Sequence, residues 1–419
     1  MEVIEIKERK KGLAPLLRFK EFKQNWEKIK YNELTTLVTN GFVGKAKDFY
    51  VDSNGITYIQ GYNVIEGGFN LNGVKQVSLE FHKRNKKSNL LLGDLLTIQT
   101  GDIGITTIVT KELVGSNCHA LIISRFKRDL AFPYFYMLFF NSHKGRNALK
   151  TIETGSTMKH LNVGDIVDLF VPHTVLLEQQ KIASFLSSID KKIQQLTRKK
   201  VLLVQYKKGL MQQLFSGKLR FKDENRRSYS KWDEKRLDEV ANFRRGSFPQ
   251  PYGLAKWFDE INGLPFVQVY DVDDNMLLKP TTKTMISKLA SEQSVFVKAG
   301  TLVITIQGSI GRIAKTQFDA YVDRTLLIFQ SYKKPIDVDY FKYVVSLLFE
   351  IEKKKAPGGT IKTITKEALS SFKIMIPQIE EQKKIADYLS CIDNKIENVN
   401  KQIFQTQTFK KGLLQQMFV

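Results

Sequence analysis

The sequence has 419 residues, which is long for one domain and suits two or three, each able to bury its own core. Its 42% of hydrophobic and 11% of aromatic residues are typical of a folded globular protein and exclude a disordered one. The N-terminal residues lack the apolar stretch of a signal peptide, and the aromatic run Phe132–Phe140 is too short to cross a membrane.

Charge gives the first indication of a partner. Lysine and arginine number 65 against 43 acidic residues, which makes the net charge +22. Such an excess favours a polyanionic partner, because each phosphate that a basic side chain neutralises releases counterions. A basic surface that serves only solubility is the alternative. The lysines are spread along the chain rather than gathered in one segment, so no membrane surface is expected as a partner.

The cysteines and histidines do not indicate a metal site. Cys118 and Cys391 form no CxxC pair, and none of the five histidines has a metal-ligand spacing to them. We therefore expect a reduced, cytoplasmic protein that holds no metal.

The first predicted element is a globular domain over residues 15–173. Short β-rich runs bounded by glycine, such as LLTIQTG at residues 95–101, predict strands of a curled mixed or antiparallel sheet. The run FPYFYMLFFNS at residues 132–142 predicts a buried helix.

The second element is a long helix over residues 174–217. Apolar residues recur at spacings of four and three over four heptads, the pattern of a coiled-coil seam. Lys200 and Lys207 interrupt this pattern, so packing there is expected to be looser or to involve other partners. The predicted seam consists of Ile182, Leu186, Ile189, Ile193, Leu196, Leu203, Leu210 and Leu214.

The chain then repeats both elements, as a second domain over residues 218–377 and a C-terminal helix over 378–419. The phrases EQQKIASFLSSIDKKI and KKGLMQQLF of the first helix return as EQKKIADYLSCIDNKI and KKGLLQQMF, with the same separation between the two phrases. Unchanged separation is what one continuous helix requires, because a single inserted residue would rotate everything after it by about 100°. Lys410 interrupts the second seam, which consists of Ile385, Leu389, Ile392, Ile396, Val399, Thr406, Leu413 and Met417.

The two predicted domains also share short segments. GDLLTIQTGDIG resembles GTLVITIQGSIG, YIQGYNV resembles FVQVYDV, TGSTMKHL resembles GGTIKTI, and WEKIKYNEL resembles WDEKRLDEV. We therefore predict an α+β fold with two similar mixed α/β domains and two long helices. Two equal apolar seams are best buried against each other, and antiparallel packing would relate the domains by a pseudo-twofold axis, which fits the twofold symmetry of duplex DNA.

Similar domains that alternate with helices of the form EQxxIAxxLxxID…KKGLxQxLF resemble the specificity subunit of type I restriction–modification systems. The resemblance runs from about Leu16 to Val419 and is strongest in the two helices and in the GDLLTIQTG and TGSTMKHL segments. It implies two target-recognition domains that each read one half of a split site in double-stranded DNA. It also implies spacer helices that dock two modification (methyltransferase) subunits, to which restriction subunits attach.

The resemblance implies a subunit with no catalytic residues and no cofactor of its own. S-adenosylmethionine, ATP and Mg²⁺ are then expected on the partner subunits. In agreement, the sequence contains no GxxxxGK[ST] phosphate loop, no Asn-Pro-Pro-Tyr-type methyltransferase motif and no GxGxxG after a strand. The alternatives are an orphan subunit of a modification-only methyltransferase, a coiled-coil interaction protein that does not bind DNA, and a single-chain restriction enzyme, which the missing motifs oppose.

Candidate DNA-reading residues lie in the glycine-bounded turns that the two domains share. Glutamine and asparagine pair with adenine, arginine and lysine with guanine, and serine or threonine with either. Turns that have only a structural role are the alternative. The candidates are Gln60, Tyr62, Asn63, Gln99, Thr100, Ser156, Thr157 and Lys159 in the first domain, and Gln268, Tyr270, Asp271, Gln307, Ser309, Arg312, Thr360 and Lys362 in the second.

Three basic clusters are more suited to phosphates than to bases, or belong to a solvated surface. They are Lys83-Arg84-Asn85-Lys86-Lys87, Arg244-Arg245 and Lys353-Lys354-Lys355.

The heptads predict that the helices set the gap between two half-sites. From Ile182 to Leu214 the first helix spans about 50 Å at ~1.5 Å per residue. Inserting four residues near Thr197 keeps the seam nearly in phase and lengthens the helix by ~6 Å. We expect the methylated motif of that variant to keep its half-sites and to gain one or two base pairs in the gap.

A two-residue insertion at the same place is the control for this expectation. It rotates the seam by about 200° and should abolish assembly. An unchanged gap in the active four-residue variant, measured by methylome sequencing, would show that the helices do not set the spacing.

Overall fold

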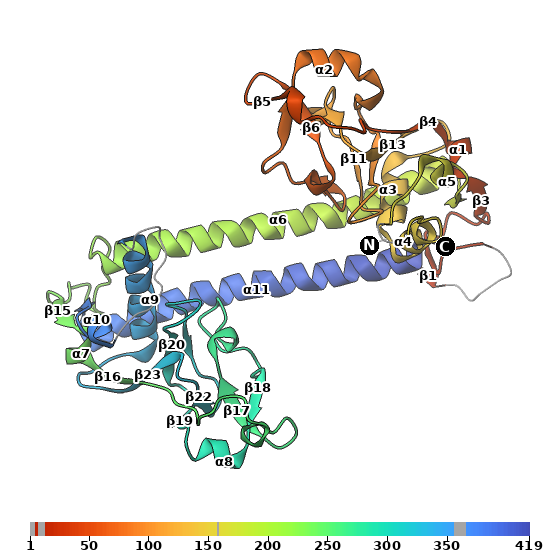
Figure 1. Cartoon of the computed structure of the whole chain (residues 1–419). Helices are drawn as coiled ribbons and strands as arrows, with labels where there is room; N and C mark the ends of the chain where they lie inside the picture. The colour runs from red at the N-terminus through yellow and green to blue at the C-terminus, as the bar shows by residue number, and fades with distance from the viewer. Residues whose placement is uncertain (1–4, 7–12, 157–158, 356–365) are drawn as a thin grey trace. The chain divides into compact units, whose positions relative to one another are not determined.

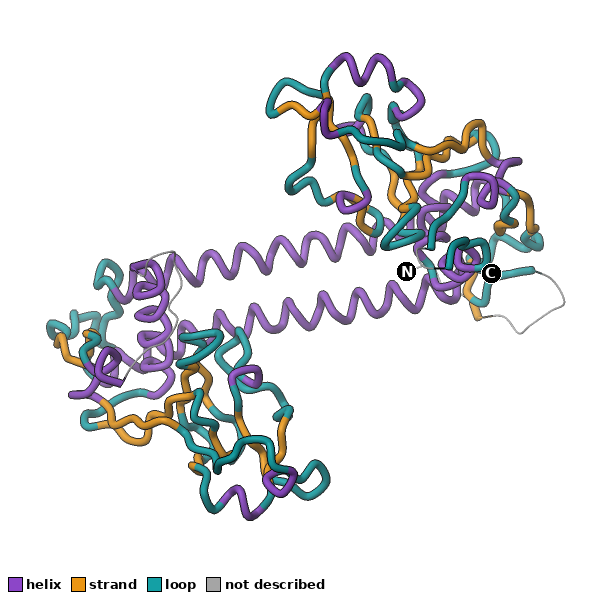
Figure 2. Tube along the Cα trace, viewed as in Figure 1, coloured by secondary structure: helices purple, strands orange, loops and turns teal. Residues whose placement is uncertain are grey.

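The computed structural model describes residues 5–6, 13–156, 159–355 and 366–419. The chain forms two compact units: the first comprises residues 1–197 with 401–419, and the second comprises residues 198–400. Each unit therefore contains one globular domain and parts of two long helices, α6 (Leu176–Phe215) and α11 (Ile379–Met417). Figure 1 colours the first globular domain from red to yellow and the second from green to blue, and Figure 2 distinguishes their strands from their helices.

The globular domain of the first unit contains two four-stranded sheets. One is wholly antiparallel, in the order β11-β10-β13-β4, and the other, β12-β6-β9-β5, includes the parallel pair β12–β6. The strands of the first sheet are β4 (Thr35–Asn40), β10 (Leu95–Ile98), β11 (Thr106–Ile108) and β13 (Leu121–Phe126). Those of the second are β5 (Tyr50–Val51), β6 (Ile56–Ile59), β9 (Lys75–Val77) and β12 (Asn117–Cys118). The mixed sheet content agrees with the sequence prediction.

Shorter elements complete this unit. They are β1 (Glu5–Ile6), β2 (Leu17–Arg18), β3 (Glu27–Lys30), β7 (Val64–Ile65), β8 (Gly68–Phe69), β14 (Phe170–His173), α1 (Tyr31–Leu34), α2 (Leu79–Arg84), α4 (His143–Lys150) and α5 (Val163–Val167), with 3-10 turns η1 (Lys47–Phe49), η2 (Gly61–Asn63), η3 (Lys86–Ser88) and η4 (Lys111–Leu113).

The aromatic run of the first domain forms α3 (Pro133–Asn141) and is buried almost completely. Pro133 stands at the first helical position, where its missing N–H costs no hydrogen bond. The core around α3 also takes in the start of α6 and the end of α11, where Phe418 lies 5.1 Å from Phe135 and 6.3 Å from Trp26 between ring centroids. The helix ends are therefore part of the domain core.

The second unit repeats this architecture. Its antiparallel sheet has the order β16-β23-β20-β21, and its mixed sheet β18-β17-β22-β19 includes the parallel pair β17–β22. The strands are β16 (Ala241–Arg245), β17 (Leu264–Val267), β18 (Thr284–Ile286), β19 (Val295–Val297), β20 (Leu302–Thr305), β21 (Ile313–Lys315), β22 (Ala320–Val322) and β23 (Leu326–Tyr332). The other elements are β15 (Asp233–Arg236), β24 (Lys373–Ile376), α7 (Leu237–Val240), α8 (Lys288–Ser291), α9 (Val338–Lys355), α10 (Lys366–Ser370), η5 (Ala255–Trp257) and η6 (Val269–Asp271).

Within each unit the segments of α6 and α11 run antiparallel. In the first unit the end of α11 packs with the start of α6, and Lys410 donates to Asp190 at 2.5 Å. In the second unit the start of α11 packs with the end of α6, and Lys207 donates to Asp393 at 2.6 Å. The two pairs occupy equivalent places in the repeat. Lys207 and Lys410, two of the lysines that interrupt the apolar seams, therefore have acidic partners on the other helix.

The predicted seam residues lie on the packed side of each helix. All are buried except Ile193, Leu203 and Thr406, which are half-buried. Removal of this apolar surface from water supplies the main driving force for the pairing of the helices.

A buried carboxylate ties the first turn of each long helix to its domain. Glu178 is fully buried and accepts hydrogen bonds from the Arg18 guanidinium at 2.6 and 2.8 Å and from the Trp26 indole at 3.1 Å. The repeat places Glu381 in the same way, with Arg220 at 3.1 and 2.6 Å and the Trp232 indole at 2.8 Å. The recurrence of tryptophan and glutamate in the two halves of the sequence therefore has a physical cause.

The following glutamine completes each anchor. The Gln179 side chain donates to the carbonyls of Leu130 and Thr174 and accepts from the Phe132 amide. Gln382 does the same with the carbonyls of Pro335 and Pro377 and the amide of Asp337. The Glu-Gln pair that opens both helical repeats thus satisfies backbone groups that would otherwise be buried without partners.

Replacing Glu178 with alanine is expected to destabilise the first unit by about 3–5 kcal/mol, because the Arg18 charge would remain buried without its partner. Glu80→Ala is the matched control, since Glu80 pairs with Arg84 on an exposed helix turn and its loss should cost about 0.5 kcal/mol or less. Thermal unfolding of the full chain, followed by circular dichroism, compares the two variants. Equal melting temperatures would contradict the role assigned to the buried carboxylate.

Candidate nucleic-acid interface

The first group of candidate residues forms a tight turn after strand β6. The Gln60 backbone amide donates to the Asn63 side chain at 3.0 Å, which closes the turn. Asn63 is fully buried and its amide donates to the Asn70 carbonyl, so Asn63 holds the turn together. The Gln60 side chain lies between two tyrosines: it donates to the Tyr50 hydroxyl at 3.3 Å and accepts from the Tyr62 hydroxyl at 2.8 Å.

The second unit builds the same turn after strand β17. The Gln268 amide donates to the buried Asp271 carboxylate at 2.8 Å. Burial raises the pKa of Asp271, although backbone amides of Lys283 and Gln268 donate to it. The Gln268 side chain again lies between two tyrosines, donating to the Tyr252 hydroxyl and accepting from the Tyr270 hydroxyl. Tyr50 and Tyr252 were not among the residues predicted from the sequence.

The second group of candidates lies on a glycine turn between two strands. Gly101 and Gly104 have φ of 86° and 79°, and Gly308 and Gly311 have φ of 66° and 82°, values that disfavour any side chain. A Cβ atom at Gly104 would also lie 2.9 Å from Leu149. In both domains the turn closes with an equivalent hydrogen bond, from Gly104 to the Ile98 carbonyl and from Gly311 to the Thr305 carbonyl.

The two turns are neighbours in each domain. A Cβ atom at Gly61 would lie 3.9 Å from Ile98, and one at Gly308 would lie 3.6 Å from Val269. The structure therefore brings the turn that follows Gln60 close to strand β10, and the turn that follows Gln268 close to the glycine turn at Gly308, although these segments are far apart in the sequence.

The remaining candidates differ in their surroundings. Thr100, Ser156, Gln307 and Ser309 are exposed, and Gln99 is half-buried. Lys159 is exposed and pairs with Glu153 at 3.3 Å, and Arg312 pairs with Asp274 at 3.2 Å. Thr157, Thr360 and Lys362 lie outside the described residues.

Of the basic clusters, the one around α2 and η3 has four exposed basic side chains. Lys83, Arg84, Lys86 and Lys87 are exposed, and Arg84 pairs with Glu80. Arg244 and Arg245 are exposed on β16. The side chains of residues 353–355 are not among those described, although their backbone continues α9.

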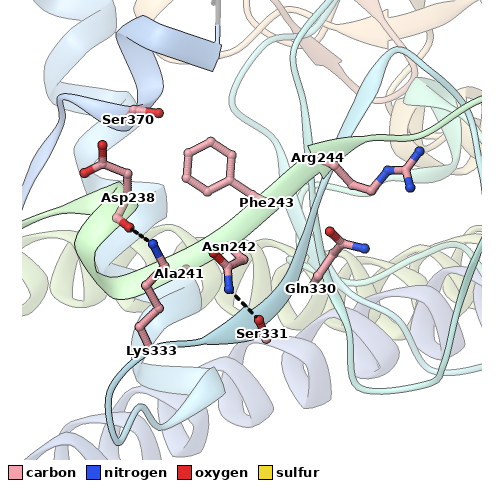
Figure 3. Close-up of a pocket in the computed structure, with 9 residues that line it drawn as sticks. All are labelled: Asp238, Ala241, Asn242, Phe243, Arg244, Gln330, Ser331, Lys333 and Ser370. Atoms are coloured by element: carbon pink, nitrogen blue, oxygen red, sulfur yellow. Dashed lines mark hydrogen bonds between the residues drawn. The ribbon is translucent and has the colours of Figure 1, made fainter.

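A polar hollow of about 660 Å³ lies on β16, the edge strand of its sheet, and on the neighbouring strand β23 (Figure 3). Asn242 donates to the Ser331 hydroxyl at 2.9 Å, and Lys333 donates to the Asp238 carbonyl at 2.7 Å. Gln330 and Arg244 are exposed beside them. Amide, hydroxyl, ammonium and guanidinium groups together provide donors for phosphates and for base edges.

Sequence analysis selected only Arg244 in this hollow. The sequence did contain an indication of this site: polar residues end strand β23 and alternate with apolar ones along strand β16. These side chains come together because residues 241–245 pair with residues 327–332 in the sheet. The two segments are far apart in the sequence, so the sequence alone does not show that they pair.

No group of three or more histidine, cysteine and acidic residues suited to a metal ion occurs in the described part of the chain. Among the helices formed by the described residues, none is both long and apolar enough to cross a membrane.

Comparison with known proteins connects these features to one family. The family model for the type I restriction modification DNA specificity domain matches residues 2–204 and again residues 229–405. A putative type I restriction enzyme specificity subunit of Methanocaldococcus jannaschii, MjaX, is 24% identical over 94% of this chain and 93% of its own length. The EcoBI specificity subunit of Escherichia coli is 21% identical over 90% and 81%.

Solved structures share the fold. The specificity subunit of a type I restriction–modification system from M. genitalium aligns with a TM-score of 0.58 at 17% identity, over 97% of this chain and 99% of its own. A chain from a study of assembly and conformational transition in a type I system aligns with a TM-score of 0.59 at 18% identity, over 93% and 96%.

The double match and the repeated α+β fold define a DNA-recognition protein without catalytic activity of its own. The chain belongs to the family of type I restriction–modification specificity subunits, as the sequence resemblance predicted.

DNA binding by this chain is expected to weaken steeply with salt, because its charge is +22. Replacing exposed Lys86 or Lys87 with alanine should lower the slope of log affinity against log salt by about 0.9 each, if each contacts one phosphate. Lys373→Ala is the control, since its ammonium already pairs with Glu234 at 2.7 Å. A duplex-binding titration from low to physiological salt measures the slopes. An identical slope in wild type and lysine variants would contradict the assignment.

Proposed function

We propose that this chain reads a bipartite site in double-stranded DNA, with one globular domain for each half-site. The observation that carries the proposal is the repetition of the same polar surface: each domain joins a Gln–Tyr turn to a glycine turn with matching hydrogen bonds. Two similar surfaces on one chain suit two separate half-sites better than one continuous site. The basic charge and the two family-model matches support DNA as the partner.

The differences between the two surfaces supply specificity for two different half-sites. Ile105 in the first glycine turn corresponds to Arg312 in the second, because each accepts the equivalent backbone hydrogen bond, from Ile98 and from Thr305. Arginine is suited to guanine and isoleucine to apolar contacts such as the thymine methyl group. The hollow at β16 adds donors in the second domain.

We further propose that the long helices dock two methyltransferase subunits, through which restriction subunits join the complex. Support comes from large apolar side chains that the helices leave exposed: Leu177, Val201, Leu202, Val204, Phe404 and Phe409. In the second unit, Val204, Met211 and Phe215 also line a hollow of about 500 Å³ with Leu347 and Ile351 of α9. Exposed apolar surface of this kind is typical of a protein-protein interface.

The chemistry then belongs to those partners. S-adenosylmethionine for methyl transfer, and ATP and Mg²⁺ for restriction, are proposed to bind there, and the complex to work in the cytoplasm. In this proposal, the present chain selects the DNA sequence and holds the partner subunits at that sequence.

Exchanging one domain tests the assignment of one domain to each half-site. The segment from about Leu16 to Val171 is replaced by the corresponding segment of a homologue with a different motif, and both helices are kept. Methylome sequencing should find one half-site changed while the other half-site and the partner complex are retained. A motif changed in both halves would contradict the proposal, and exchange of the second domain is the reciprocal control.

A further inference from the structure

The three-residue clusters around Gln60 and Gln268 are alike beyond what their sequences require. We call them the Gln–Tyr clusters: Tyr50, Gln60 and Tyr62 in the first domain, and Tyr252, Gln268 and Tyr270 in the second. The first tyrosine stands ten residues before the glutamine in one domain and sixteen before it in the other. Chain segments of different length thus bring a tyrosine hydroxyl to the equivalent amide nitrogen, so the arrangement is not a by-product of one local turn.

The hydrogen bonds fix what each cluster can offer a ligand. The Gln60 carbonyl oxygen accepts from Tyr62, and its amide nitrogen uses one of two N–H groups on Tyr50. In the second domain the Gln268 oxygen also accepts from the Thr284 hydroxyl at 2.8 Å. The groups that remain include the second amide N–H and the hydroxyl proton of Tyr50 or Tyr252, which are donors.

Tyr62, Tyr252 and Tyr270 keep their protons at neutral pH, because the pKa of each is raised. Burial raises the pKa of Tyr62 and Tyr270, and it raises that of Tyr252 to about 12. Tyr62 and Tyr270 are nevertheless 55% and 38% exposed, so the clusters are accessible from solvent. Amide N–H and hydroxyl donors in an accessible cluster suit a ligand that accepts hydrogen bonds.

Nearby charges are consistent with an anion. In the second domain the Lys283 ammonium lies 5.1 Å from the Tyr270 ring centre, and the Arg324 guanidinium lies 5.9 Å from that of Tyr252. The acidic neighbours Asp271 and Asp323 are buried. Asp271 accepts from the Gln268 amide and one oxygen of Asp323 accepts from the Thr325 amide, while the other Asp323 oxygen has no hydrogen-bond partner among the described residues. In the first domain the exposed residue Lys75 stands opposite Tyr58 in the β6–β9 strand pair, and β6 leads into the turn.

We propose that the two Gln–Tyr clusters are equivalent clamps for the DNA backbone, each donating hydrogen bonds to a phosphodiester oxygen in its own half-site. A device that is the same in two domains cannot distinguish two half-sites, so it suits what both half-sites share. Glutamine and tyrosine are common donors to phosphate, and such contacts set the register of a protein on the duplex. Base discrimination then falls to positions that differ, such as Ile105 and Arg312. This inference rests on the proposed function.

The test uses the full complex and a duplex that carries the methylated motif, with an unrelated duplex of equal length. Gln60→Leu and Gln268→Leu should each weaken binding to both duplexes by about ten-fold, the loss of one hydrogen bond to a charged group. The methylated motif and the salt slope should not change, because the lost donor is neutral. Tyr58→Phe is the matched control, since the Tyr58 hydroxyl bonds His119 at 2.9 Å and its side chain is buried.

A second measurement separates backbone contact from loss of folding. Each phosphate of the specific duplex is replaced in turn by a neutral methylphosphonate. At one position in the first half-site, the replacement should weaken binding by the wild-type protein but should not weaken binding by Gln60→Leu any further. For Gln268→Leu, the same result is expected at one position in the second half-site. Such pairwise coupling does not arise from a general structural defect.

Three results would overturn the clamp. One is a motif that relaxes at a single base pair, which indicates base reading. Another is unchanged binding by both leucine variants, which indicates a turn of structural importance only. The third is a loss of affinity in the leucine variants that remains additive with every methylphosphonate replacement. Wild-type binding to the bipartite duplex tests the proposed function separately, since its absence would refute that function whatever the variants do.

Discussion

The structure depends on one buried interaction that occurs twice: a glutamate in the first turn of a long helix, held by an arginine and a tryptophan of the adjoining domain. A buried carboxylate without partners would be costly, and here the guanidinium and indole N–H groups satisfy Glu178 and Glu381. The helix can therefore enter the domain core in one orientation only. Trp26 and Trp232 also belong to the cores that contain residues of α3 and α9, so the junction joins the long helix to the packing of each domain.

The pairing of the helices combines apolar area with a few ionic contacts. The seam residues provide the area, while Lys207–Asp393 and Lys410–Asp190 interrupt it at equivalent places. Burial lowers the pKa of Lys207, while Asp393 favours its charged form, and the Tyr343 hydroxyl also donates to Asp393 at 2.6 Å. Such a pair adds little to stability compared with apolar packing. It opposes any alternative alignment of the helices, because a shift would leave a lysine against apolar side chains.

In each domain, glycine turns and a buried polar side chain support the polar surface. Glycines with positive φ close the turns, and buried Asn63 or Asp271 holds the neighbouring turn from below. Side chains above these supports vary between the domains, as with Ile105 and Arg312, while the Gln–Tyr clusters do not. A scaffold that keeps its supports and exchanges its surface residues can recognise different DNA sequences without refolding, which suits a subunit whose task is specificity.

The sequence by itself determined the α+β fold class, the family and the two long helices, whose bounds of Leu176–Phe215 and Ile379–Met417 lie within the predicted ranges. Hydrophobic periodicity and repeated phrases are local properties of the chain, so they are visible without coordinates. Only the tertiary structure decided that Glu178 meets Arg18, that Tyr50 and Tyr252 reach the shared glutamines, and that Asn242 and Ser331 meet at a sheet edge. Those contacts depend on strand pairing and on connecting segments of unequal length. The spacing of residues in a sequence does not specify which residues such segments bring together.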